Sequence, residues 1–183
     1  RRFVAVSPLQ RIDGGLELFT QDGGLAAQLQ RAARGMEIEF RVRVHGELPA
    51  ERFAALAAGE LDSGGTLTVL ACEPAGGEGS NRWYALVTRG ASGRSVRQLF
   101  ERQGATVSRV LRVRFGTLVL DRNLPRGHSR ALTDAELAAL TGEPAGTAGA
   151  DSPAGSVRPG PARPRSGPKR PSKPARAARA RRR

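Results

Sequence analysis

The sequence contains few of the residues that build disulfide-bonded, metal-binding or membrane-spanning proteins. Its single cysteine, Cys72, excludes an internal disulfide and is typical of a reducing compartment. The two histidines, His45 and His128, stand far apart and have no metal-ligand spacing with Cys72, so we expect no metal site. No apolar run approaches the roughly 18 residues of a membrane-spanning helix. We therefore expect a cytoplasmic protein that does not enter a membrane.

Acidic residues are also scarce. The chain has 17 of them against 30 lysines and arginines, which gives a net charge of +13 and a pI near 11.6. This excess predicts a polyanionic partner, and nucleic acid is the leading candidate. The charge is uneven, because residues 141–183 hold eleven basic and two acidic residues whereas residues 1–140 are only mildly basic.

Composition also divides the chain. The last aromatic residue is Phe115, and eight of the twelve prolines lie at or beyond Pro144. A segment of Pro, Ala, Gly, Ser and Arg buries too little apolar surface to offset its chain entropy. We therefore expect a folded domain over 1–140 and a disordered basic tail over 141–183. The tail is either an electrostatic tether for RNA, which salt would weaken, or a solvated extension.

The folded part alternates strand and helix patterns. Residues 36–44 alternate apolar and charged side chains with a period of two, which predicts a half-buried strand. Asp22 is a suitable N-cap for a helix over 24–33, and Thr133 and Glu136 form a capping box. Further strands are expected over 3–6, 16–20, 66–72, 82–88, 107–115 and 118–120, further helices over 49–58 and 93–103, and a hairpin turn at 76–79. This order favours an α+β fold.

Two consecutive elements carry five arginines: Arg94 and Arg97 on the expected helix, and Arg109, Arg112 and Arg114 on the strand that follows. Spacing places Arg94 and Arg97 on one helix face. It also places Arg112 and Arg114 on one sheet face, opposite Leu111, Val113 and Phe115. Together these arginines form either a cluster for RNA phosphates or a solvated face that Glu101 partly neutralises.

Trp83 and Tyr84 are adjacent in an expected strand, so their side chains point to opposite faces of the sheet. We expect one in the core, while the other either packs as well or stacks on a nucleic-acid base. No glycine-rich phosphate loop of the P-loop or dinucleotide type occurs, and we expect no cofactor.

Three segments resemble one known family. Residues 76–84 (GGEGSNRWY) resemble its motif G-G-E-G-x-N-x-W-Y, and residues 16–23 (LELFTQDG) resemble G-L-L-L-F-T-x-D-G. Residues 94–100, 107–116 and 124–127 are similar to R-x-V-R-R-L-[WF], V-S-R-L-x-R-x-x-[YF]-G and L-x-x-G. The family is that of the ribosomal-RNA pseudouridine synthases of the small- and large-subunit type, and the match to its large-subunit branch covers about residues 3–140.

The resemblance implies a mixed, mainly antiparallel sheet with flanking helices. It also implies an S4-type RNA-binding domain ahead of the catalytic domain, which we expect to be missing here together with the N-terminal part of the catalytic domain. The family's catalytic motif is G-R-L-D-x-x-T-x-G-L, and an ungapped match places Ser7-Pro8-Leu9-Gln10 on G-R-L-D. Gln10 therefore stands where the family has the aspartate that attacks the uridine or starts glycosidic cleavage. A glutamine side chain does not ionise and fills neither role.

Two other positions complete the implied site. Phe40 stands where the family has an active-site tyrosine that stacks on the flipped base, and it keeps the ring without the hydroxyl. Arg11-Ile12-Asp13 repeats the R-L-D pattern three residues after the ungapped match. Asp13 either supplies the catalytic carboxylate or makes the turn before Gly14 and Gly15.

Two functions follow from these observations. The first is an enzyme that isomerises one uridine of large-subunit ribosomal RNA after flipping its base, with Asp13 as carboxylate, Phe40 as stacking face, Arg97 as counter-charge and the other arginines on phosphates. The second is a relative without catalysis that only binds ribosomal RNA, for example during ribosome assembly. The family segments argue against a third reading, a basic DNA-binding domain. We expect a monomer.

Overall fold

The structure, a computed structural model, describes residues 2–142. The tail predicted over 141–183 lies outside the described residues, apart from Thr141 and Gly142 at the end of helix α4 (Asp134–Thr141). No helix in the described part is long and apolar enough to cross a membrane.

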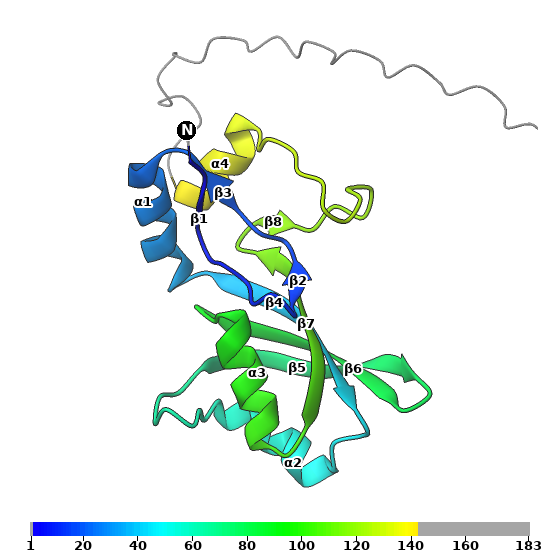
Figure 1. The fold of residues 1–183 in the computed structure, drawn as a ribbon. Coiled ribbons are helices and arrows are strands. Elements are labelled where there is room, and N and C mark those ends of the chain that lie inside the picture. The colour runs from blue at the N-terminus through cyan, green and yellow to red at the C-terminus, as the bar shows by residue number, and fades with distance from the viewer. Residues whose placement is uncertain (1, 143–183) are drawn as a thin grey trace, which may run out of the picture. The chain divides into compact units, whose positions relative to one another are not determined.

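A mixed sheet forms the centre of the fold (Figure 1). Its strands run in the order β2-β7-β4-β6-β5, and β8 also pairs with β7. Their bounds are β2 (Gly14–Gly15), β4 (Glu37–His45), β5 (Thr68–Glu78), β6 (Asn81–Arg89), β7 (Thr106–Phe115) and β8 (Leu118–Val119). Within this sheet β2 and β7 pair in parallel and the other pairs are antiparallel. The predicted α+β fold with a mixed, mainly antiparallel sheet is confirmed.

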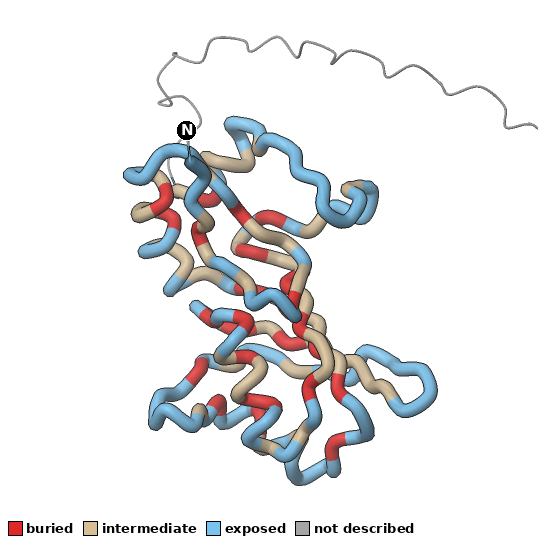
Figure 2. The backbone as a smooth tube through the Cα atoms, in the orientation of Figure 1, coloured by how far each residue is buried: buried red, intermediate tan, exposed pale blue. Residues whose placement is uncertain are grey.

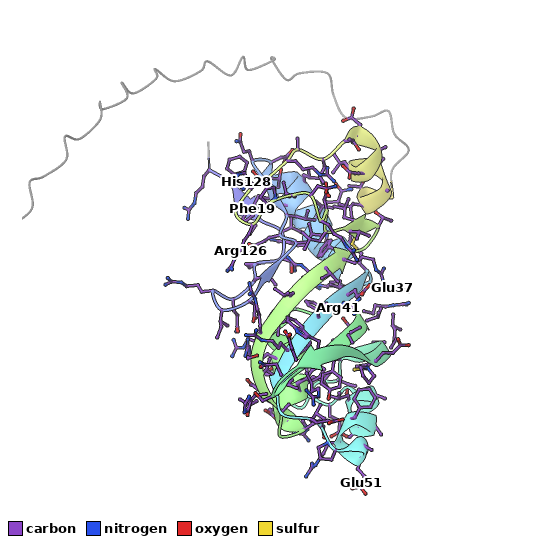
Figure 3. All side chains as sticks on the ribbon, turned by 90° about the vertical axis from the view of Figure 1, so that its right-hand side faces the viewer. Phe19, Glu37, Arg41, Glu51, Arg126 and His128 are labelled. Atoms are coloured by element: carbon purple, nitrogen blue, oxygen red, sulfur yellow. The ribbon has the colours of Figure 1, made fainter. Side chains whose placement is uncertain are left out.

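Strand β4 shows why the sheet has two different faces. Ile38, Phe40, Val42 and Val44 are buried, while the charged residues between them are partly or fully exposed. We call the buried side the inner face and the side of the charged residues the outer face. Buried positions recur along the strands in Figure 2, and Figure 3 shows the outer-face side chains of Glu37 and Arg41.

The helices start where their capping residues predict. Asp22 caps α1 (Gly23–Ala33) through the amides of Gly24 and Leu25. Capping boxes open α3 (Gly93–Arg102) at Ser92 and α4 at Thr133. Helix α2 (Ala50–Ala55) continues into a 3₁₀ turn, η1 (Leu56–Ala58). A separate ladder joins β1 (Val4–Ala5) to β3 (Phe19–Thr20).

Helices α2 and α3 cover the inner face. Phe53 of α2 and Phe100 of α3 contact the ring of Tyr84 at centroid distances of 5.6 and 5.7 Å. The hydroxyl of Tyr84 accepts a hydrogen bond from the Leu48 amide. Trp83 points to the outer face, so the predicted opposition of the two aromatic residues is confirmed.

The hairpin between β5 and β6 differs from the sequence prediction. Residues 76–79 were expected to form the turn, but β5 continues to Glu78 and the turn consists of Gly79 and Ser80. The register shifts between Pro74 and Gly77, where two residues of β5 oppose the single residue Trp83, so the strand takes up one extra residue before the turn.

Irregular pairing also changes which residues of β7 share a face. Phe40 pairs with Arg112 and Glu39 pairs with Arg114, which leaves Val113 as the extra residue of a bulge. Arg112 therefore shares the inner face with Phe115, while Arg114 lies on the outer face. The expectation that Arg112 and Arg114 share a face is wrong, because period-two alternation does not continue through a bulge.

Arg112 is fully buried and ties the N-terminal segment to the sheet. Its guanidinium donates to the Leu16 carbonyl at 2.7 Å, and to the hydroxyl and carbonyl of Ser7 at 2.9 and 2.8 Å. It also lies over the ring of Phe115, 5.2 Å from the centroid. Burial lowers the pKa of Arg112 to about 10 and the charge of Glu17 opposes this shift, so the group stays protonated at neutral pH.

Replacing Arg112 by methionine should destabilise the fold. Methionine keeps an aliphatic stem of similar length but has no donors, so the Ser7 and Leu16 carbonyls lose their hydrogen bonds. We expect a loss of about 2–4 kcal/mol in the free energy of unfolding. Urea titration of the full chain measures it. Arg114→Gln on the outer face is the control, with an expected loss below about 1 kcal/mol. Equal losses in the two variants would contradict the assigned role of Arg112.

Candidate active site

The loop before β2 places Asp13 beside β7. The amide of Asp13 donates to the Gln10 carbonyl at 2.9 Å, which closes a turn over residues 10–13. Gln10 is exposed in this turn, whereas Asp13 is buried. The backbone of Asp13 thus completes the turn that was one of the two predicted alternatives, whereas its side chain points towards Arg97 on α3.

The carboxylate of Asp13 forms a buried ion pair. Its Oδ1 accepts from Arg97 Nη2 at 2.6 Å and from the Val110 amide at 3.2 Å. The side chain of Asp13 has no exposed surface, and that of Arg97 is 13% exposed. Water screens such a pair little, so its charges hold each other in place more strongly than those of a surface pair.

This pair lies at the open edge of β7. Strand β2 pairs only with Leu111 and Arg112, and its approach is so close that a side chain at Gly15, where φ is 102°, would collide with the backbone of Arg112. Before Leu111 the edge has no strand neighbour on this side. Arg97 Nη1 donates to the Val107 carbonyl at 2.8 Å, and Asp13 accepts from Val110. The two side chains thereby satisfy backbone groups that a further strand would otherwise bind.

Three polar atoms around the pair remain without a hydrogen-bond partner in the described structure. They are Asp13 Oδ2, Arg97 Nε and Arg109 Nε, and all three are buried. A Cβ at Gly93, in the first turn of α3, would lie 3.5 Å from Asp13 Oδ2. The positive end of the α3 dipole is therefore close to this oxygen and favours its negative charge. The site holds a carboxylate oxygen with unused capacity to accept a proton or a hydrogen bond.

The structure places Phe40 differently from the expectation of an accessible stacking face. Phe40 has no exposed surface and packs within the core on the inner face of β4. Its neighbour across the sheet is Arg112. In this conformation the ring of Phe40 cannot stack on a base, because the surrounding side chains already cover it.

The five arginines do not form one cluster. Arg94 is exposed on α3, and Arg97 is committed to Asp13. Arg112 is buried and hydrogen-bonded to the N-terminal segment, so it is not accessible to a phosphate. Arg114 pairs with Glu37 and Glu39 at 3.6 and 3.5 Å on the outer face. Arg109 is half-buried on the outer face beside the Asp13 site.

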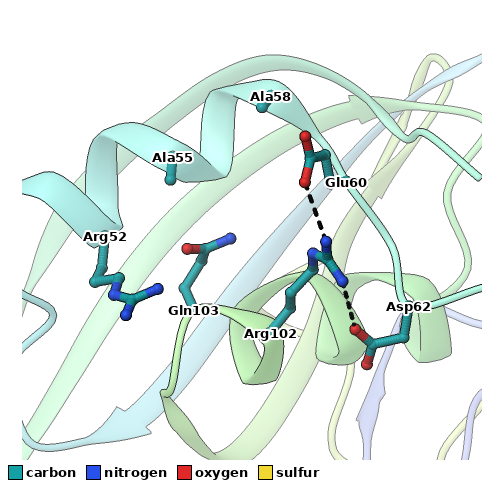
Figure 4. A pocket seen from close by; sticks show the side chains of 7 residues that line it. All are labelled: Arg52, Ala55, Ala58, Glu60, Asp62, Arg102 and Gln103. Carbon is teal, nitrogen blue, oxygen red and sulfur yellow. Dashed lines mark hydrogen bonds and ion pairs between the residues drawn. The ribbon is translucent and has the colours of Figure 1, made fainter. Parts of the chain in front are cut away.

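Other polar features of the described residues lie apart from this site. A surface pocket beside α2 and the end of α3 contains Arg102, which bridges Glu60 and Asp62 at 3.2 and 3.0 Å (Figure 4). Burial, reinforced by the charge of Glu73, raises the pKa of the Cys72 thiol to about 12, so this thiol is protonated at neutral pH. No three potential metal ligands come together in residues 2–142.

The backbone groups of Val107 and Val110 were not predicted as partners of the ion pair. Spacing alone does not reveal which segment of β7 lacks a strand neighbour. Arg109 was not predicted to lie near this site either, because side-chain directions along β7 depend on its register with β4, which shifts a second time between Arg43 and Val44.

The pairing of Asp13 with Arg97 should be measurable as an interaction energy. In a double-mutant cycle of Asp13→Asn and Arg97→Gln, we expect a coupling of about 1.5–3 kcal/mol in the free energy of unfolding, because either single change leaves the other group buried without its partner. The matched cycle of Glu39→Gln and Arg114→Gln should give less than about 1 kcal/mol. Additive effects of Asp13→Asn and Arg97→Gln would rule out the proposed coupling.

Comparisons with known proteins agree with this fold and with the sequence motifs. No protein-family model matches the chain. Over 126 residues, 69% of this chain, it is 41% identical to ribosomal large subunit pseudouridine synthase B of Vibrio cholerae, covering 39% of that protein. Over the same length it is 39% identical to the protein of that name from Escherichia coli K12, covering 43% of it.

A solved structure adds evidence on the fold. A crystal structure of a pseudouridylate synthase superimposes with a TM-score of 0.61 at 22% identity, over 75% of this chain and 59% of the other. The chain spans about two-fifths of the length of the curated relatives that it matches. The identity over the matched residues nevertheless confirms the resemblance found in the motifs: the chain belongs to the family of ribosomal pseudouridine synthases.

Proposed function

We propose that the protein isomerises a uridine of large-subunit ribosomal RNA to pseudouridine. The reaction breaks the bond between N1 and C1′, forms one between C5 and C1′, and moves a proton from C5 to N1, so its balance needs no cofactor. The names of the relatives support the reaction and the substrate. The protein would act in the cytoplasm as a monomer, on a substrate that it holds mainly by charge.

The buried carboxylate of Asp13 carries this proposal. One of its oxygens is fixed by Arg97 and by the Val110 amide, and the other has no partner among the described residues. The protein thus holds one oxygen of this carboxylate in place and leaves the other without a partner among the described residues. Asp13 Oδ2 would attack the uridine or start cleavage of the glycosidic bond.

Arg97 is the positioning residue in this proposal. Its guanidinium orients the Asp13 carboxylate, and its bond to the Val107 carbonyl fixes the guanidinium in turn. Arg94 is exposed one residue after Gly93, which lies next to Asp13 Oδ2. A phosphate bound by Arg94 would therefore be near the reacting nucleotide.

Access to the carboxylate requires the segment from Ser7 to Ile12 to move while Asp13 keeps its bonds to Arg97 and the Val110 amide. Leu9 packs against Gly93 next to Asp13 Oδ2, and Arg112 holds Ser7. Arg112 is also the cross-strand neighbour of Phe40. Displacing this segment would uncover Asp13 Oδ2.

The proposal is tested by mapping pseudouridines in ribosomal RNA. Cells that lack the protein should lose one modification, and the wild-type gene or a Gln10→Ala variant should restore it, because Gln10 is exposed and outside the site. The Asp13→Asn variant should not restore it, since an amide lacks the nucleophilic charge. Circular dichroism of the purified variant shows that it is folded.

Two outcomes would contradict the enzyme reading. One is full restoration by Asp13→Asn, and the other is an unchanged pattern of pseudouridines in cells without the protein. In the second case, binding of ribosomal RNA by the purified protein would support the non-catalytic RNA-binding relative as the function.

A further inference from the structure

The outer face carries a row of three side chains that the catalytic proposal does not use. Arg43 of β4 pairs with Trp83 of β6 on one side and with Arg109 of β7 on the other. Directly paired residues project from the same face of a sheet. Trp83, Arg43 and Arg109 therefore lie side by side across three strands, and each is half-buried.

The next row extends this surface. His45, two residues beyond Arg43, pairs with Asn81, two residues before Trp83. Residues two apart on a strand share a face, so His45 and Asn81 border the row. We call these five residues, Arg43, His45, Asn81, Trp83 and Arg109, the outer-face patch.

The patch has positive charge that the described residues do not neutralise. Arg43 and Arg109 have no ion pair within 4.0 Å in this part of the chain, and Arg109 Nε is buried without a hydrogen-bond partner. Towards the other end of the same face, Glu39 pairs with Arg41 and Arg114. The free charge is therefore concentrated around Trp83.

The side chains of Arg43 and Trp83 are held in position by their contacts. Arg43 Nε donates to the Ser108 hydroxyl at 2.9 Å, and its guanidinium carbon lies 5.7 Å from the centre of the Trp83 ring. A cation over an indole is a favourable contact. The result is a planar aromatic and guanidinium surface whose geometry is set before a ligand arrives.

We propose that the outer-face patch binds a single-stranded segment of RNA. One base stacks on Trp83 or on the adjoining guanidinium of Arg43, and Arg43 and Arg109 contact phosphates. A free strand fits because the bases of a duplex are stacked on each other and do not offer a face. The choice of RNA over DNA rests on the proposed function.

The position of Arg109 links the patch to the candidate active site. Arg109 precedes Val110, whose amide binds Asp13. Its Nη2 would lie 3.5 Å from a Cβ at Gly14, the residue after Asp13. An RNA strand held on the outer face therefore passes the edge of β7 at which Asp13 lies, and the patch fixes nucleotides that flank the target.

Trp83 is the only tryptophan of the chain, so its fluorescence reports on the patch directly. Titration of the full chain with oligouridylate at moderate salt should quench this fluorescence to saturation. Arg43→Gln should weaken the binding measured by this quenching roughly tenfold. Arg102→Gln, which removes an arginine already paired with two carboxylates away from the patch, should leave it unchanged.

A second readout separates the patch from other basic segments. Anisotropy of labelled oligouridylate reports all binding, so Trp83→Leu should lower affinity in that assay as well. Binding seen by anisotropy without any change in Trp83 fluorescence would overturn the proposal. So would tighter binding of oligodeoxythymidylate than of oligouridylate.

These binding experiments can distinguish failure of the patch from failure of the catalytic proposal. If Arg43→Gln binds oligouridylate as the wild type does while Asp13→Asn abolishes modification, the patch fails and the proposed function stands. If Asp13→Asn is active while Trp83 is still quenched as expected, the patch stands and the catalytic role of Asp13 fails.

Discussion

The ion pair between Asp13 and Arg97 closes an edge of β7 that β2 is too short to cover. It joins three segments that are far apart in the sequence: the turn that ends at Asp13, the helix that carries Arg97, and the strand that offers the Val107 carbonyl and the Val110 amide. Each partner of the pair also satisfies a backbone group, so loss of either exposes two unmet bonding groups. The geometry of the candidate site depends on this closure.

Strand β7 brings the functional surfaces together because its pairing with β4 is irregular. Two register shifts leave Arg112 on the inner face, and Arg109 and Arg114 on the outer face. Arg112 thus anchors the N-terminal segment from the inner face, while Arg109 lies beside Arg43 on the outer face. The same strand supplies the backbone groups that bind the catalytic candidate. The bulge at Val113 separates Arg114 from Arg112, which regular alternation would have placed on the same face.

Much of the fold follows from the sequence, for physical reasons. The alternation along 36–44 identifies β4, and Asp22 and Thr133 mark the starts of α1 and α4, because side-chain caps act locally. The bulge at Val113 and the two-residue turn after Glu78 were missed. Both depend on the register between strands, which a single segment does not encode.

The candidate site was predicted only in part, for the same kind of reason. The repeated R-x-D pattern pointed to Asp13, and helix spacing pointed to Arg97, and the structure brings the two together at 2.6 Å. That this carboxylate performs the catalysis is our proposal. The burial of Phe40 agrees with its place on the apolar side of the alternation over 36–44. The burial of Arg112 could not be predicted, because it depends on the bulge at Val113 and on the register with β4.

Hydrogen exchange of the Val110 amide tests the closure of the β7 edge most directly. In the wild-type protein, NMR should show that this amide exchanges slowly, as an amide bonded to a buried carboxylate does. In an Asp13→Ala variant it should exchange at least about tenfold faster, while amides of β4 that bond within the sheet keep their protection. An equally slow Val110 amide in the two proteins would contradict the account, because some other group would then close the edge.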